Sequence, residues 1–183
     1  MEAPYLISGE LQMGVPFRMI SQQVQAAHLV ASSAYPNERQ LASIISQAKG
    51  LSHLATVGLE HTSLTCSNIL IGFDGVIKIA GLEFCEEHPL DQSQAQSIQA
   101  LVAITMELMQ KHGKDDGVVG VDDLNRWPID SDAVKFLSAA SSATCLEILK
   151  QHPLIMKQHG SAGELVGLAR LALISTRTFY CYK

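Results

Sequence analysis

The chain is poor in aromatic residues and in charge. Aromatic side chains make up 5% of its 183 residues, which leaves few of the stacking platforms that bind single-stranded nucleic acid. Charged residues make up 17%, and the formal net charge is −5. Because phosphate contacts need a basic face, this acidic balance argues against a nucleic-acid partner.

Long apolar runs and paired cysteines are also missing. No uninterrupted apolar stretch reaches the roughly 20 residues of a membrane-spanning helix, and the N-terminus lacks the basic and apolar regions of a signal peptide. The four cysteines are scattered without a Cys-x-x-Cys pair, which predicts reduced thiols. We therefore expect an intracellular, cytoplasmic protein with no membrane partner. The cysteines are Cys66, Cys85, Cys145 and Cys181.

The hydrophobic content of 47% over this length is enough for one domain with a substantial core. Asn37 and Gln40 form a capping-box pattern before an apolar stripe of helical period, which predicts one helix ending at Gly58. Further helices are expected over 94–111, from Ser131, from Thr144 to before Pro153, and in the apolar segment 165–174. The N-terminal stretch suggests short strands at 5–7 and 17–20 and a weak helix over 22–34.

Between these helices the hydrophobic period changes to that of strands. The β-branched runs 69–71 and 76–79 flank the residues Gly72-Phe73-Asp74-Gly75. An Asp-Gly turn between two such runs is a strong hairpin signal. The predicted fold is therefore mainly α, in the α+β class, with a small β-hairpin.

The hairpin and the loop before it resemble a known family. The loop reads His61-Thr62-Ser63-Leu64-Thr65-Cys66-Ser67-Asn68, and Lys78-Ile79-Ala80 ends the hairpin. The spacing matches the catalytic loop of protein kinases, His-Arg-Asp-Leu followed by three variable residues and Asn, and the hairpin that leads to Asp-Phe-Gly. The chain therefore resembles the C-terminal lobe of protein kinases, and looks especially like the degenerate kinase-like proteins of filamentous fungi.

The resemblance implies a division of the chain. It covers residues 37–156, with 1–36 as a remnant hinge or linker and 157–183 as a divergent tail. No Gly-x-Gly-x-x-Gly loop and no Val-Ala-Ile-Lys strand occurs, so an N-lobe is expected to be absent or incomplete. The Asp that braces the catalytic loop from the central helix of the lobe aligns with about Ser97.

The departures from the family pattern concern its chemistry. The catalytic Asp is replaced by Ser63 and the metal-binding Asp by Gly81, so no catalytic residue is intact. His61, Leu64 and Asn68 remain of the loop, and the resemblance makes His61 a structural residue. Asn68 matches the second metal ligand, but a single amide is a weak magnesium site. We therefore expect no cofactor, neither ATP nor magnesium.

These residues predict a catalytically inactive pseudokinase fragment that acts as a protein-binding module, with a partner that the sequence does not identify. A relic without a selected role remains open beside it. The alternative is an ATP-binding protein with residual serine/threonine kinase activity, completed by another chain that supplies an N-lobe.

Other groups of residues give weaker evidence for a metal site or a catalytic site. Zinc is disfavoured because Cys85 with His88, or His61 with Cys66, has no second local pair. A hydrolase centred on Ser63 lacks a Gly-x-Ser-x-Gly elbow, and the pairs 115–116 and 122–123 of aspartates lack calcium-loop spacing. Trp127, the single tryptophan, is expected to anchor its loop to the core. The segment 165–174 is expected either to close a face of the lobe or to offer a partner surface.

Overall fold

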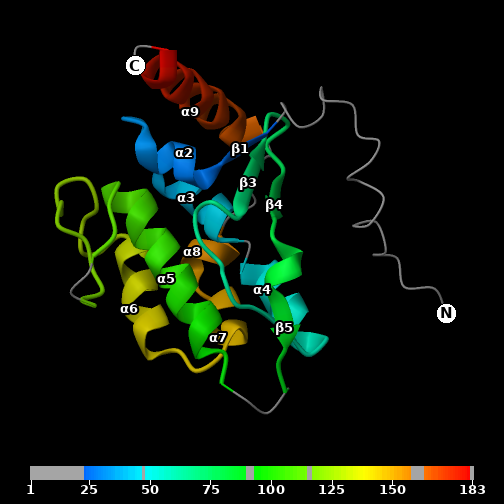
Figure 1. The fold of residues 1–183 in the computed structure, drawn as a ribbon. Coiled ribbons are helices and arrows are strands. Elements are labelled where there is room, and N and C mark those ends of the chain that lie inside the picture. The colour runs from blue at the N-terminus through cyan, green and yellow to red at the C-terminus, as the bar shows by residue number, and fades with distance from the viewer. Residues whose placement is uncertain (1–22, 47, 90–92, 115–116, 158–162, 182–183) are drawn as a thin grey trace.

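The computed structural model describes residues 23–46, 48–89, 93–114, 117–157 and 163–181, with the backbone alone for residue 48 and residues 179–181. This part of the chain is α+β and mainly helical, as predicted (Figure 1). The expected strands at 5–7 and 17–20 lie outside the described residues. The helices are α2 (Ala26–Ala31), α3 (Glu38–Ile45), α4 (Ala48–Thr56), η1 (Leu82–Phe84, a 3-10 helix), α5 (Ala95–Gln110), α6 (Asp132–Ser142), α7 (Leu146–Lys150), α8 (Pro153–Met156) and α9 (Gly163–Cys181).

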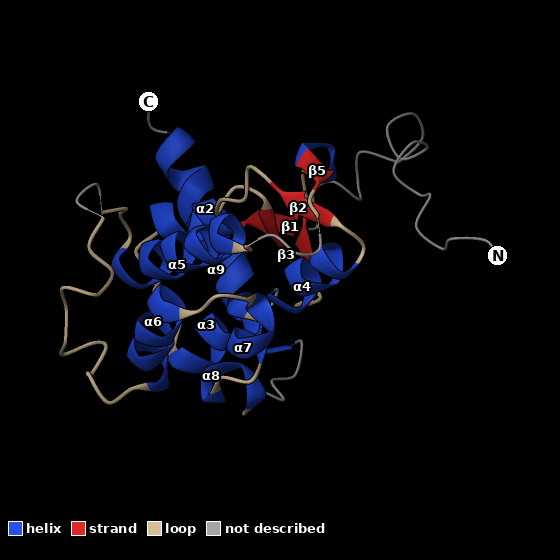
Figure 2. Cartoon of the chain, turned by 90° about the horizontal axis from the view of Figure 1, so that it is seen from below, coloured by secondary structure: helices blue, strands red, loops and turns tan. Residues whose placement is uncertain are grey.

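Short antiparallel strands form two small sheets. One has the order β1-β3-β4, and the other pairs β2 with β5. The strands gather at one side of the helical body (Figure 2). The strands are β1 (Gln23–Gln25), β2 (Leu59–His61), β3 (Ile69–Gly72), β4 (Ile77–Ile79) and β5 (Cys85–Glu87).

The predicted hairpin is confirmed. Strands β3 and β4 pair with Ile69 opposite Ile79, and the Gly72 N–H donates to the Val76 carbonyl at 2.8 Å. Gly75 adopts the left-handed φ of +82° that the turn requires, and Asp74 Oδ1 accepts from the Val76 N–H at 3.0 Å. The local sequence is sufficient to form this turn.

The single helix expected from Asn37 to Gly58 is wrong, because the chain forms two helices there, α3 and α4. The capping box of Asn37 with Gln40 is present, but the first helix ends at Ser46. The Ser46 hydroxyl donates to the Ser43 carbonyl at 2.6 Å, and such bonds compete with helix continuation. The break lets α3 pack on α5, α6, α8 and α9, while α4 packs on α7 and β2.

Helix α5 lies at the centre of the core, and nine of its residues from Ser97 to Met109 are buried. The predicted span is confirmed, although the helix ends at Lys111, which has a left-handed φ of +71°, and not at Gly113. Helix α9 packs on α2, α3, β1 and β3. Its buried residues therefore share one core with β1 and α2, so residues before 37 and after 156 pack together. Among the described helices, none is long and apolar enough to cross a membrane.

Candidate functional site

The loop between β2 and β3 is held by the buried ring of His61, which is 1% exposed. Its Nδ1 accepts from the Ser63 N–H at 3.3 Å, and its Nε2 lies 3.0 Å from the Ala80 carbonyl oxygen. Because Nδ1 accepts, the ring proton is on Nε2 and is donated to Ala80. The His61 ring therefore joins the loop to the end of β4.

The other loop residues divide into buried and exposed positions. Leu64 is 7% exposed and belongs to the core, whereas Ser63 is exposed. Asn68 bridges the two sides of the loop. Its backbone carbonyl accepts from the Ala80 N–H at 2.7 Å, and its side-chain Oδ1 accepts from the Thr65 hydroxyl at 2.9 Å.

Gly81 lies against His61 and Asn68, so the structure brings these three predicted positions together. Its φ is +80°, in the left-handed region that favours glycine. A Cβ at this position would lie 2.8 Å from Asn68 Nδ2, 2.9 Å from Phe84 Cδ2 and 3.3 Å from His61 Nε2. Both the backbone and the crowding therefore favour a glycine.

The donor set of this loop does not fit a magnesium ion. Magnesium prefers carboxylates and phosphate oxygens in octahedral geometry. Ser63 carries a neutral hydroxyl, Gly81 has no side chain, and Asn68 Oδ1 already accepts a hydrogen bond from Thr65. Ser63 is also a poor base for activating a hydroxyl nucleophile, since a serine hydroxyl is neutral at neutral pH.

Sequence reasoning missed Glu60, a buried carboxylate next to the loop. It is 8% exposed, and its Oε1 accepts from the Ser97 hydroxyl at 2.8 Å and from the Ser97 N–H at 3.1 Å. Its Oε2 lies 3.2 Å from His88 Nδ1. Ser97 is in the first turn of α5, where backbone N–H groups lack helical partners, so Glu60 caps that helix from a strand.

The resemblance predicted a brace between the loop and about Ser97, with the acid of the family on the helix. In this chain the acid lies on β2 and the hydroxyl on α5. One feature of the sequence could have indicated that the acid lies on β2, namely an acidic residue between Leu59 and His61 in a short strand. An acid at such a position needs a buried partner.

The residues weighed for zinc do not converge. In the described part of the chain, no three His, Cys, Asp or Glu side chains gather closely enough to hold a metal ion. Burial raises the pKa of the Cys66 thiol, and the neighbouring Glu107 raises it further. Burial, and secondly Glu83, also raises the pKa of Cys85, while His88 faces Glu60. Neutral thiols are poor zinc ligands. Cys66, Cys85 and Cys145 are free.

Lys111 lies near Cys66 and caps the C-terminal end of α2. Its Nζ donates to the Leu29 carbonyl at 2.7 Å and to the Ala34 carbonyl, and it lies 4.7 Å from the centre of the Tyr35 ring. Burial, and secondly the charge of Arg126, lowers its pKa from 10.5 to about 8. Both ends of α5 therefore take part in capping contacts with distant segments.

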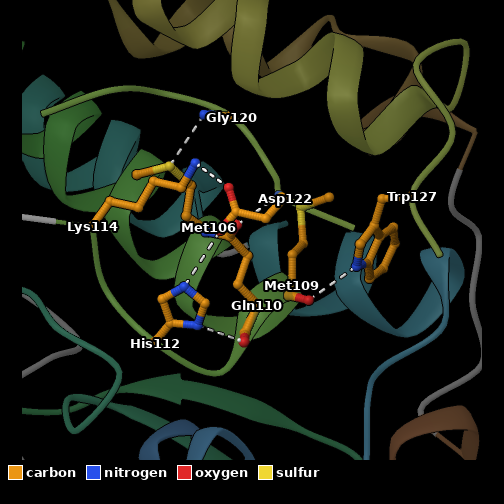
Figure 3. Close-up of polar contacts among 8 residues, drawn as sticks. All are labelled: Met106, Met109, Gln110, His112, Lys114, Gly120, Asp122 and Trp127. Atoms are coloured by element: carbon orange, nitrogen blue, oxygen red, sulfur yellow. Dashed lines mark hydrogen bonds and ion pairs between the residues drawn. The ribbon is translucent and has the colours of Figure 1, made fainter. Parts of the chain in front are cut away.

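In the loop between α5 and α6, Asp122 and Asp123 form ion pairs and hydrogen bonds with residues of that same segment. Asp122 contacts Lys114 at 2.8 Å and His112 at 3.5 Å (Figure 3). A hydrogen bond from Lys114 lowers the pKa of the Asp122 carboxyl. Asp123 Oδ1 accepts from the backbone N–H groups of Asn125 and Arg126, both at 3.1 Å. Residues 115–116 lie outside the described part.

Trp127 anchors this loop to α5, as predicted. Its indole is 4% exposed, and Nε1–H donates to the Met109 carbonyl at 3.0 Å (Figure 3). The Gly120 N–H contacts the Met106 sulfur at 3.4 Å and adds a second attachment. The loop is therefore part of the folded core and its tryptophan contributes to stability.

An apolar hollow of about 470 Å³ lies between α5 and α6, away from the loop that precedes the hairpin. The described residues that line it are apolar or neutral. Ile98, Val102, Ala103, Met106 and Ala140 are among the residues that line it.

Comparisons with known proteins give no family for this chain. A scan against protein-family models and a search of curated proteins both found no match.

We predict that an acid introduced at Gly81 lowers the stability of the protein much more than an acid introduced at Ser63. Gly81→Asp will lower the free energy of unfolding by about 1–3 kcal/mol, because a non-glycine residue must adopt a left-handed φ against close neighbours. Ser63→Asp will change it by less than about 0.5 kcal/mol, because Ser63 is exposed. Urea denaturation followed by circular dichroism measures both. Equal effects of the two substitutions would contradict the crowding at Gly81.

Proposed function

We propose that the chain is a kinase-like C-lobe with an absent or incomplete N-lobe, that it does not transfer phosphate, and that it acts by binding another protein. The observation that carries this proposal is Gly81. Gly81 has no carboxylate to hold a metal ion, and its left-handed backbone and close neighbours Asn68, Phe84 and His61 disfavour a residue that would supply one.

The loop around Gly81 supports the proposal because it retains the connections of a catalytic loop without the reacting groups. His61 and Asn68 both join the loop to Ala80, and Glu60 joins β2 to α5. Phosphoryl transfer depends on positioned charges around the transferred group. A neutral Ser63 and a side-chain-free Gly81 supply none.

A protein partner is supported by apolar side chains beside the same loop. Leu82 is 52% exposed and Phe84 is 46% exposed, and both lie in η1 directly after Gly81. Exposed apolar groups next to one another are typical of protein contact surfaces.

The test is a thermal shift with ATP and magnesium, together with an assay for phosphate transfer. A ligand that binds only the native state adds about 2.7 kcal/mol at 100 times its Kd, which a melting curve detects. We expect no shift and no transfer, and the same result for the Ser63→Asp/Gly81→Asp double variant, which still lacks an N-lobe.

The control is Asn68→Ala, which removes the one retained ligand of the metal pattern. A shift with ATP in the wild-type protein that disappears in Asn68→Ala would overturn the proposal in favour of ATP binding. Phosphate transfer by either the wild-type protein or the double variant would show that the missing N-lobe is not needed.

A further inference from the structure

Helix α9 has one buried face and one exposed face. The buried face consists of Leu165, Leu168, Ala169, Ala172 and Thr176, at helical spacing. On the opposite side Leu171 is 49% exposed and Ile174 is 62% exposed. The segment expected either to close the fold or to offer a surface therefore does both.

The exposed face of α9 is basic. Arg170 and Arg177 are exposed on the same side of the helix as Leu171 and Ile174. The helix has no acidic residue after Glu164. Within the described part of the chain, neither arginine has an ion-pair partner. We call the four residues Arg170, Leu171, Ile174 and Arg177 the α9 face.

A second surface also has two exposed apolar side chains, but its charged side chains are acidic. It consists of Leu82, Glu83, Phe84, Glu86 and Glu87 from η1 and β5, all of them exposed, and we call it the acidic edge. No carboxylate of the acidic edge is paired with a described cation. The sequence has no Lys or Arg between Lys78 and Lys111, so the edge is not neutralised by its own segment.

Strand β5 also has backbone groups that are free to bind. Among the described strands it pairs only with β2, and the bonds at its two ends run from Thr62 N–H to Phe84 O and from His88 N–H to Gly58 O. In an antiparallel ladder the bonded residues alternate, so the polar groups of Cys85 and Glu87 point away from β2. The Cys85 N–H donates to the Leu82 carbonyl, so the Cys85 carbonyl and the backbone groups of Glu87 are the ones that face outward. Such an edge favours contact with another molecule.

We propose that the α9 face of one copy binds the acidic edge of a second copy. Each surface places two apolar side chains among charges of one sign, and the signs are opposite. Complementary charges of this kind set orientation and speed association. The two surfaces lie at different ends of the molecule, with α9 at the top and β5 near the bottom of Figure 1. A contact between different surfaces repeats head to tail, so it extends beyond a dimer unless it closes into a ring.

The contact is small, with four exposed apolar side chains in total, so we expect reversible association that depends on protein concentration. The charges lie at the surface, where salt screens them over about 8 Å at physiological ionic strength. This inference uses Leu82 and Phe84, the side chains that the proposed function assigns to a protein contact, and it names a second copy of the chain as the protein bound there. It does not rest on the proposed loss of catalysis. Its test measures self-association, whereas the ATP assays test the proposed loss of catalysis. One of the two proposals can therefore be overturned while the other stands.

The experiment is sedimentation velocity of the full chain over a range of protein and salt concentrations. We expect the sedimentation coefficient of the wild-type protein to rise with protein concentration and to fall with added salt. Arg170→Glu/Arg177→Glu alone and Glu83→Lys/Glu86→Lys/Glu87→Lys alone are expected to stay monomeric. Circular dichroism shows that each variant is folded, which is expected because all five side chains are exposed.

Mixing the two variants should restore association, because each reversed surface then meets one of opposite charge. Combining all five substitutions in one chain should restore it as well. The inference is overturned if the wild-type protein stays monomeric at every concentration, if either variant alone associates like the wild-type protein, or if the mixture does not associate. A monomeric wild-type protein that binds phosphatidylserine vesicles through Arg170 and Arg177 would also overturn it, by assigning the α9 face to a membrane surface.

Discussion

Trp127→Ala is expected to lower the free energy of unfolding by about 3–5 kcal/mol, the usual cost of truncating a buried aromatic side chain. The indole is 4% exposed and fills the space between the loop and α5. Its loss also leaves the Met109 carbonyl without the 3.0 Å bond from Nε1. Since a domain of this size is stable by only about 5–15 kcal/mol, the variant should melt at a much lower temperature.

The measurement is urea denaturation followed by circular dichroism, because the substitution removes the only tryptophan and with it the fluorescence signal. Trp127→Phe is the matched control. It keeps an aromatic ring but lacks the Nε1–H donor, and should cost less than the alanine variant. A cost below about 0.5 kcal/mol for Trp127→Ala, typical of a surface position, would contradict the anchoring of this loop.

Glu60→Ala is expected to lower the free energy of unfolding by about 1.5–3 kcal/mol, the range for losing hydrogen bonds to a buried charged group. The substitution leaves the Ser97 N–H and hydroxyl without their acceptor and the His88 ring without the carboxylate at 3.2 Å. It also removes a negative charge from the N-terminal end of α5, where the helix dipole favours one. Thermal and urea denaturation measure the loss.

Two further variants show whether the effect belongs to this network. Glu60→Gln keeps an acceptor oxygen without the charge and should cost less than Glu60→Ala. Ser97→Ala should remove part of the same interaction, so the double variant Glu60→Ala/Ser97→Ala should cost less than the sum of the two single variants. Strict additivity would mean that Glu60 and Ser97 do not act together.

Much of the fold could be predicted because its signals are local. The turn at Asp74-Gly75, the capping box of Asn37 with Gln40 and the cap of α6 by Ser131 each depend on a few neighbouring residues. The buried face of α5 follows from hydrophobic period in the same way. The break at Ser46 was missed because the apolar stripe continues through it.

The candidate site was predicted only in part. The loop positions His61, Asn68 and Gly81 were found through spacing, and the structure brings them together. The brace by Glu60 was not found, because it joins residues 37 positions apart. The crowding at Gly81 by Phe84 and the α9 face also could not be seen, since both depend on which side chains meet after folding.

By itself, the sequence determined most of the helices, the hairpin and the absence of acidic groups at Ser63 and Gly81, because hydrophobic period, turn chemistry and residue identity act over a few neighbouring positions. Only the tertiary structure decided which distant groups complete the helix ends, as Glu60 does for α5, Glu38 for α6 and Lys111 for α2. The physical reason is that a buried N–H or carbonyl at a helix end needs a partner, and several polar side chains could serve. Packing alone brings one of them within hydrogen-bonding distance.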